Sequence, residues 1–188
     1  MRIVLAGEGK HELGGWTDRP PFRQIVPAPG MLVALLERAG CDHEVLDGRV
    51  WKDIPLFAAG GHASREQRRM RRLRLDALEA GARVVVWVRD RDGDRARERE
   101  LNEAAAEPHE VSLAGGVAVE SIDAWILALQ GASRPDFSSR PKIRAGYPGV
   151  AERVELVRRG DLKAAAARSP SLRRWLAAIH ATWKPGET

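Results

Sequence analysis

The stretch 83–95, RVVVWVRDRDGDR, decides the fold class. Its first six residues are almost all apolar and rich in valine, which predicts a strand buried on both faces. A second apolar run, RIVLA at 2–6, ends at Gly7 and predicts another buried strand. Buried strands of this kind need helices on both sides. We therefore expect an α/β protein with a mainly parallel sheet.

Helical patterns alternate with these strands along the chain. We expect helices at 31–39, 64–80, 95–106 and 121–129, weaker strands at 43–46 and 109–113, and a turn at Gly115 and Gly116. Three further helices, near 150–159, 161–168 and 171–182, close the sequence. The predicted organisation is an α/β domain over 1–130, followed by a loop and helical C-terminal appendage over 131–188 that packs on it.

Composition narrows the class of protein. The chain has 188 residues, of which 44% are hydrophobic, and a formal net charge of +5. The single cysteine, Cys41, excludes an internal disulfide. No run approaches the roughly 18 apolar residues of a membrane span, and charge returns at Glu8, too early for a signal peptide. We expect a cytoplasmic protein with no membrane partner, whose basic balance permits a polyanionic one.

Acidic residues gather at the ends of predicted elements. They form three clusters, namely Glu8 with Glu12, then Asp90, Asp92 and Asp94, and finally Glu120 with Asp123. The first two clusters follow buried parallel strands, so both fall at the carboxyl edge of the sheet, where open α/β sheets bind ligands. Crowded carboxylates repel one another, and a hard cation removes that cost. The pattern predicts a Mg²⁺ site, with Mn²⁺ as the alternative ion.

Three motifs carry a resemblance to a known family. Glu8-Gly9-x-x-Glu12 after the first strand and Asp90-x-Asp92 after a later one resemble the Toprim signature. The segment SIDAWIL at 121–127 resembles a Glu-Ala-Trp-Leu-Leu-type motif of uncharacterised bacterial Toprim-like proteins, a domain-of-unknown-function group. The segment SPSLRRWL at 169–176 is similar to that group's C-terminal helix. The chain also resembles the Toprim part of the overcoming-lysogenization-defect nucleases.

The resemblance implies a Toprim/Rossmann-like fold and roles for individual residues. Glu8 would be a general base or metal ligand, Asp90 and Asp92 would coordinate Mg²⁺, and Glu12 would support them. Asp123 stands where the group has Glu, so Glu120 is an alternative to it, and Asp92-x-Asp94 is an alternative pairing. The implied activity is that of a nuclease, a metal-dependent phosphodiester hydrolase acting on DNA or RNA. An ATPase partner and a setting in phage defence are further implications.

Other interpretations of the same residues remain open. One is a non-catalytic regulatory or scaffolding subunit with a degenerate metal site, which the Asp123 departure favours. Another is a haloacid-dehalogenase-type phosphatase of small molecules, with Asp90 as nucleophile and Asp92 as acid/base. The acidic clusters also have structural explanations. Asp near a helix start caps the helix, and the first cluster could be a solvated turn that caps the helix after it. Glu120 and Asp123 could be first-turn acids of a buried helix.

Basic and aromatic residues supply candidate contacts to nucleic acid. Helical spacing puts Arg65, Arg68, Arg69 and Arg72 on one face of the helix at 64–80, opposite a buried side formed by Met70, Leu73 and Ala77. That face is either a phosphate-backbone contact surface, or a surface that is solvated or contacts acidic groups of the same chain. Lys10 and Trp16, near the first acidic cluster, are further candidates. The oligomeric state is left open.

Overall fold

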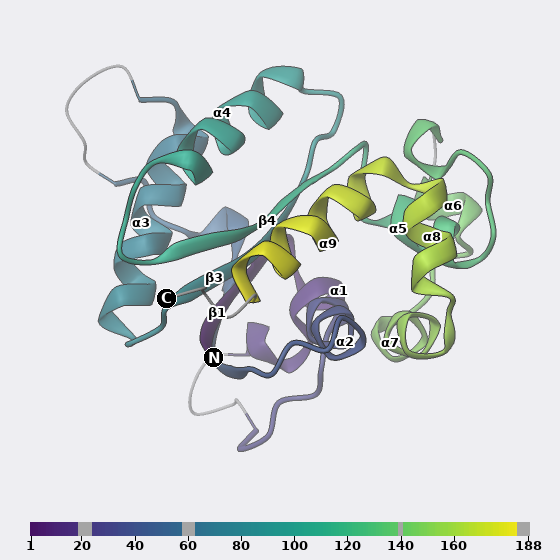
Figure 1. Ribbon diagram of the computed structural model, residues 1–188, viewed down its shortest axis with the longest axis horizontal. Helices are drawn as coiled ribbons and strands as arrows, with labels where there is room; N and C mark the ends of the chain where they lie inside the picture. The colour runs from purple at the N-terminus through teal and green to yellow at the C-terminus, as the bar shows by residue number, and fades with distance from the viewer. Residues whose placement is uncertain (19–23, 58–62, 139–140, 184–188) are drawn as a thin grey trace.

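Four parallel strands form the centre of the molecule. The computed structural model describes residues 1–18, 24–57, 63–138 and 141–183. The strands are β1 (Arg2–Gly7), β2 (Glu44–Val50), β3 (Val84–Asp90) and β4 (Ser112–Ala118). Their order in the sheet is β2-β1-β3-β4, and every neighbouring pair is parallel. The α/β class and the parallel sheet predicted from the sequence are confirmed (Figure 1).

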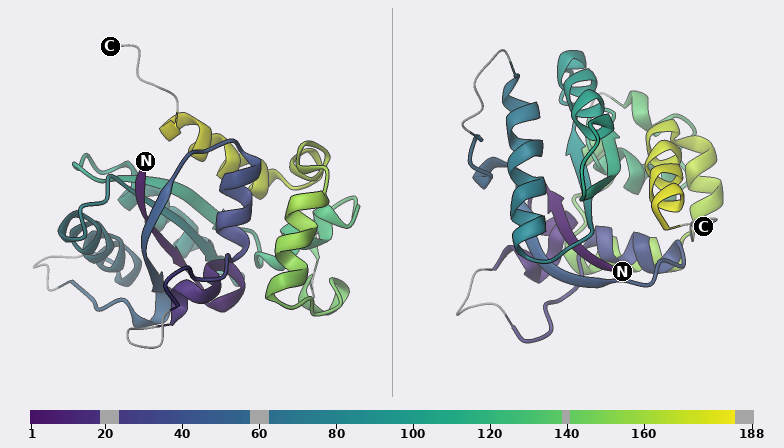
Figure 2. Two further views of the ribbon diagram at one scale, coloured as in Figure 1. Left: turned by 90° about the horizontal axis from the view of Figure 1, so that it is seen from below. Right: turned by 60° about the vertical axis from the view of Figure 1, so that its left-hand side comes forward.

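Helices cover both faces of this sheet. On one face lie α3 (Arg65–Glu79) and α4 (Arg95–Ala106). The other face carries α1 (Lys10–Leu13), α2 (Met31–Arg38), α5 (Asp123–Leu129), α7 (Val150–Arg159), α8 (Leu162–Arg168) and α9 (Pro170–Trp183), with α6 (Pro141–Arg144) beside α5. Figure 2 shows α3 and α4 on one side of the sheet and α9 on the other. Short 3₁₀ helices lie at η1 (Gly14–Thr17), η2 (Trp51–Asp53) and η3 (Pro135–Phe137).

Strand alternation sorts the core into two clusters. Ile3 and Leu5 of β1 pack among α2, α5 and α9, whereas Val4 and Ala6 face α3 and α4. Strand β3 divides in the same way, because successive side chains of a strand point to opposite faces. Its even-numbered valines from 84 to 88 join the α2 side, and Val85 joins the α3 side together with Trp87.

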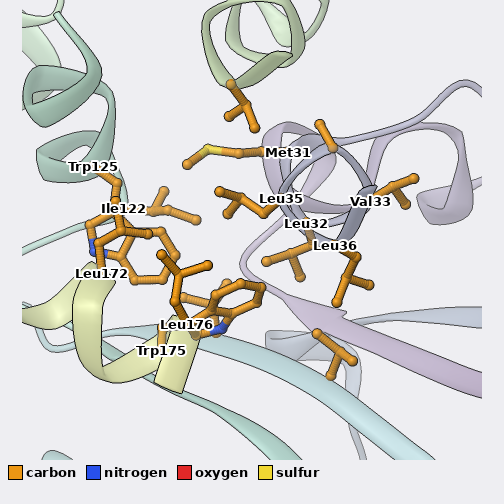
Figure 3. Close-up of a cluster of buried hydrophobic side chains, with 14 of the residues drawn as sticks. Met31, Leu32, Val33, Leu35, Leu36, Ile122, Trp125, Leu172, Trp175 and Leu176 are labelled. Carbon is orange, nitrogen blue, oxygen red and sulfur yellow. The ribbon is translucent and has the colours of Figure 1, made fainter. Parts of the chain in front are cut away.

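The C-terminal helices share the larger of these clusters. Leu172 and Trp175 of α9 lie against side chains from α2 and α5, as Figure 3 shows. The rings of Trp125 and Trp175 have centroids 5.7 Å apart. The Trp175 indole N–H donates to the carbonyl oxygen of Trp87 at 2.9 Å, which ties α9 directly to β3. Helices α7, α8 and α9 therefore bury their apolar faces in the same core as the sheet.

The fourth strand differs from its prediction. It runs over Ser112–Ala118, so Gly115 and Gly116 lie inside the strand and do not form a turn. A side chain at Gly115 would collide with the carbonyl oxygen of Trp87 on β3, so this glycine permits a close approach of two backbones. Strand β2 is also longer than predicted, and β3 continues to Asp90. Among the described residues no helix is long and apolar enough to cross a membrane.

Candidate functional site at the carboxyl edge of the sheet

The register of β1 and β3 places Glu8 beside Arg89. Ala6 pairs with Trp87, so two residues further on Glu8 is level with Arg89. The Arg89 guanidinium donates to Glu8 Oε1, and the backbone N–H of Asp90 donates to the same oxygen at 3.2 Å. Glu8 is thus held by an arginine and a backbone amide at the end of β3.

Glu8 and Asp90 lie on opposite faces of the sheet, although they share its edge. Arg89 follows Val85 and Trp87 in the alternation of β3 and interacts with residues on the α3 side. Asp90 follows the even-numbered valines, and its Oδ1 accepts the backbone N–H of Ile122, at the start of α5, at 2.8 Å. Glu8 and Asp90 therefore meet at one edge but not on one face.

An arginine-rich group occupies the α3 side of the edge. Glu66 on α3 is 8% exposed and accepts the indole N–H of Trp51 at 2.8 Å. Three guanidiniums share its carboxylate, those of Arg69 at 3.7 Å, Arg89 at 3.7 Å and Arg97 at 3.4 Å. The charges of these cations offset the hydration that the Glu66 carboxylate loses on burial.

Arg97 also fixes the loop that carries Asp92. Its Nη1 donates to the carbonyl oxygens of Asp90 at 2.9 Å and Arg91 at 3.1 Å, and to Asp92 Oδ2 at 2.8 Å. Asp92 has φ of 50°, in the left-handed region that costs a non-glycine residue free energy. The Arg97 contacts hold this loop in its unusual backbone conformation.

Glu12 is a buried carboxylate on the other side of the edge. It is 4% exposed, and its Oε2 accepts the backbone N–H of Gly9 at 2.8 Å, so it caps the start of α1. A Cβ at Gly7 would lie 2.8 Å from Glu12 Cβ, so the glycine permits this close packing. Burial raises the pKa of Glu12, although its backbone hydrogen bonds and the charge of Arg153 act to lower it.

Asp90 is the most perturbed carboxyl of the site. Burial is the largest cause, and it raises the pKa of Asp90 to about 7. The hydrogen bond from Ile122 lowers this pKa, while the negative charges of Glu12, Asp92 and Asp123 raise it further. Asp90 and Glu12 are thus neighbouring carboxyl groups for which ionisation is costly.

Asp123 is neutralised from within the protein. Its carboxylate is 8% exposed and accepts a hydrogen bond from Arg153 of α7, a side chain that is 1% exposed. The second oxygen of Asp123 accepts the hydroxyl of Ser121 at 3.2 Å. Asp123 is therefore already paired with a buried cation, Arg153, within the protein itself.

The remaining acidic candidates have partners that explain them. Asp94 accepts the backbone N–H groups of Ala96 at 3.0 Å and Arg97 at 3.2 Å, which makes it the N-cap of α4, as the capping interpretation expects. Glu120, at φ of 63°, accepts Arg91 Nη2 at 2.6 Å. Neither of these carboxylates needs a metal ion to account for its position.

The basic face predicted on α3 is divided. Arg69 is buried against Glu66, so the four arginines do not form one exposed surface. Arg65 is exposed, Arg68 donates to the carbonyl oxygen of Phe57 at 2.8 Å, and Arg72 pairs with Asp76 at 2.7 Å. The prediction that Met70, Leu73 and Ala77 are buried is confirmed.

The two remaining nucleic-acid candidates lie near the first acidic cluster. Lys10 on α1 is 4.0 Å from Asp18 and has a largely exposed side chain. Trp16 packs closely over Gly48 of β2 and against the larger core cluster, so part of its ring is covered.

The donor chemistry at Asp90 and Glu12 fits a hard divalent cation. Neither carboxylate forms an ion pair within 4.0 Å in the part of the chain that the structure describes. Across those same residues, no three His, Cys, Asp or Glu side chains are grouped to coordinate a metal. Mg²⁺ does not need such a group, because it commonly binds through one or two carboxylates and keeps several waters. The buried carboxylate of Glu12 and the partly buried carboxylate of Asp90 meet that requirement.

Sequence reasoning missed the arginines that organise the edge. Arg89 and Arg97 bind the predicted carboxylates Glu8 and Asp92, and Arg153 binds Asp123. The alternation of strand residues was a usable signal for Arg89, because adjacent side chains of a strand point to opposite faces and Arg89 therefore faces away from Asp90. No local pattern identifies Arg153, which lies 30 residues from its partner. The chain matches no protein-family model, no curated protein and no solved structure.

Proposed function

We propose that this chain is a Mg²⁺-dependent phosphodiester hydrolase acting on nucleic acid, with Asp90 and Glu12 as the carboxylates that hold the ion. One observation carries the proposal: at the carboxyl edge of a parallel sheet, the buried carboxyl of Glu12 and the partly buried carboxyl of Asp90 act on one another, and both have raised pKa values. A bound ion would lower the pKa of a water and neutralise charge on the phosphodiester. The resemblance to Toprim-like proteins supports the same chemistry, an ATPase partner and a role in phage defence.

The residues of the chain have distinct tasks in this proposal. Asp90 Oδ1 is fixed by the Ile122 N–H and Glu12 Oε2 by the Gly9 N–H, which leaves the second oxygen of each carboxylate to hold the ion. Arg97 keeps the loop at Asp90 and Asp92 in place. Arg89 and Arg97, on the same edge, supply positive charge for a phosphate backbone.

A cleavage assay with matched variants tests this function. Supercoiled plasmid, single-stranded DNA and tRNA are incubated with Mg²⁺ or Mn²⁺ and either the wild-type protein, Asp90→Asn or Asp161→Asn. Asp161 is the N-cap of α8 and belongs to no part of the proposed site, so it controls for loss of a carboxylate. We expect Asp90→Asn to lose more than the roughly 100-fold that outer-shell changes cost, and Asp161→Asn to keep its activity. Equal cleavage by wild type and Asp90→Asn contradicts the proposal.

A non-catalytic regulatory or scaffolding role is the second candidate. Arginines already neutralise Glu8, Asp92 and Asp123, three of the carboxylates predicted to hold or assist the metal, and this pairing favours the alternative. The two functions differ in one measurable respect. A scaffolding subunit would bind Mn²⁺ at Asp90 and cleave none of the three substrates, with or without an added ATPase.

A further inference from the structure

The position of Arg153 is not explained by the helix that carries it. Arg153 is the fourth residue of α7 and lies in its first turn. A cation near a helix N-terminus opposes the helix macrodipole. Its side chain is nevertheless 1% exposed, and removing a guanidinium from water is costly unless its charge is compensated. The neighbouring carboxylates must therefore compensate the charge of Arg153, and Arg153 in turn neutralises part of theirs.

The contacts of Arg153 hold its guanidinium in one place. Its Nε donates to the carbonyl oxygen of Pro148 at 2.9 Å, and its Nη2 donates to the carboxylate of Asp123. Its Nη1 has no hydrogen-bond partner within the described residues, so a buried donor remains for a ligand or water. A backbone anchor and a buried ion pair make this cation a fixed part of the site.

The net charge of the side chains in the site matches the charge of one divalent ion. The charge of Arg153 acts on Glu12 as well as Asp123, and Asp123 acts on both Glu12 and Asp90. Three ionised carboxylates and one guanidinium give a net charge of −2 (−3 plus +1). One divalent cation neutralises that charge, whereas two would leave a buried excess of positive charge.

We propose that Arg153 is a permanent counter-ion of this site, so that the chain binds one divalent metal ion there, and that Asp123 is the partner of Arg153 and not a metal ligand. This inference rests on the proposed function for the identity of the ion. Arg153 is a positioning residue in this proposal, because its charge acts through the carboxylates and its side chain does not touch the substrate.

Counting bound Mn²⁺ tests the proposal without any substrate. Isothermal titration and electron paramagnetic resonance of the full chain with Mn²⁺ alone should give one ion for the wild type. Arg153→Gln should bind one ion at least about tenfold more tightly, because the carboxylates then carry a net charge of −3 with no internal cation. Two ions in the wild type, or equal affinities of the two proteins, overturns the proposal. An ion in Arg153→Gln and none in the wild type contradicts both the one-ion count and the proposed function. No ion in either protein overturns both.

A second variant keeps the test decisive if Arg153→Gln does not fold. Asp123→Asn/Arg153→Gln replaces the ion pair by two neutral amides of similar shape. We expect it to bind one Mn²⁺ within about threefold of the wild-type affinity, because neither residue is a ligand. A loss of affinity of more than about tenfold, typical of damage to a metal's own ligands or their direct supports, would instead make Asp123 a ligand.

Discussion

The two sides of the carboxyl edge have opposite charge patterns. On the α3 side, three guanidiniums share one buried carboxylate, that of Glu66. On the α5 side, one buried guanidinium, that of Arg153, pairs with Asp123 and acts on Glu12, and both of these carboxyls act on Asp90. Each side thus depends on a single counter-charge supplied by a helix.

The difference arises from the alternation of β3. Arg89 and Asp90 are adjacent in the sequence, but they interact with groups on opposite faces of the sheet. The arginine side is more fully paired, since Arg89 and Arg97 also bind Glu8 and Asp92. The carboxylate side retains two groups with raised pKa values, so a bound cation would stabilise this side more than the arginine side.

The largest effect is expected from removing the counter-charge of the arginine side. Glu66→Gln keeps an oxygen for the Trp51 indole but leaves three guanidiniums without this carboxylate. We expect the free energy of unfolding to fall by about 3 kcal/mol in urea titrations, since breaking a buried charge pair leaves an uncompensated charge. Glu103→Gln, at an exposed pair with Arg99, is the matched control and should change stability by about 0.5 kcal/mol at most. Equal effects of the two variants would show that Glu66 is not the organising charge.

A smaller effect of opposite sign is expected on the carboxylate side. The pKa of Asp90 is about 7 in the folded protein against an ordinary 3.8, so between those values the native state binds more protons than the unfolded chain. The free energy of unfolding therefore falls as pH rises through this window and is level above it. Asp90→Asn removes that cost. In chelator at pH 8 it should be more stable than the wild type by about 2 kcal/mol, roughly half of what the pKa difference alone corresponds to, because Asp90 is only partly buried and solvent screens its charge. At pH 5 the difference should be smaller.

Thermal unfolding of both proteins at the two pH values measures this difference. The same stability difference at pH 5 and pH 8 would mean that the pKa of Asp90 is not raised by folding. The proposed difference between the two sides of the edge would then be wrong for Asp90. Mn²⁺ should stabilise the wild type at pH 8 and leave Asp90→Asn nearly unchanged.

The smallest effect concerns the link between the two sides. Arg97→Lys keeps the charge beside Glu66 but loses the planar group that binds the carbonyl oxygens of Asp90 and Arg91. We expect a loss of about 1 kcal/mol, because Arg97 is partly exposed and solvent screens its ion pairs. Arg99→Lys, on the exposed face of the same helix, should cost a few tenths of that. A cost as large as that of Glu66→Gln would make Arg97, and not Glu66, the centre of the arginine side.

Much of the fold could be predicted because its signals are local. The valine run of β3 and the short apolar run of β1 predicted buried strands, and both are present. Helices α4 and α7 have the predicted bounds. The Ser64 cap and the helix after it were also predicted correctly. The error at Gly115 and Gly116 arose because glycine is a turn signal by default, whereas here the backbone of β3 lies too close for a side chain.

The candidate site was predictable only in part. The sequence brought Glu8, Glu12 and Asp90 to one edge, and the structure places all three there. It could not give the register of β1 against β3, which sets Glu8 level with Arg89. Register depends on packing between distant segments, and a shift of one residue would move every side chain to the other face.

The sequence by itself determined the parallel α/β class, the positions of most helices and the gathering of acidic residues at the carboxyl edge, because periodicity and capping act within a few residues. Only the tertiary structure decided which carboxylates keep their charge unpaired. Arg153 reaches Asp123 from α7, and Arg89 reaches Glu8 across β1 and β3. These pairings form because a buried charge must find a partner wherever the folded chain brings one within reach.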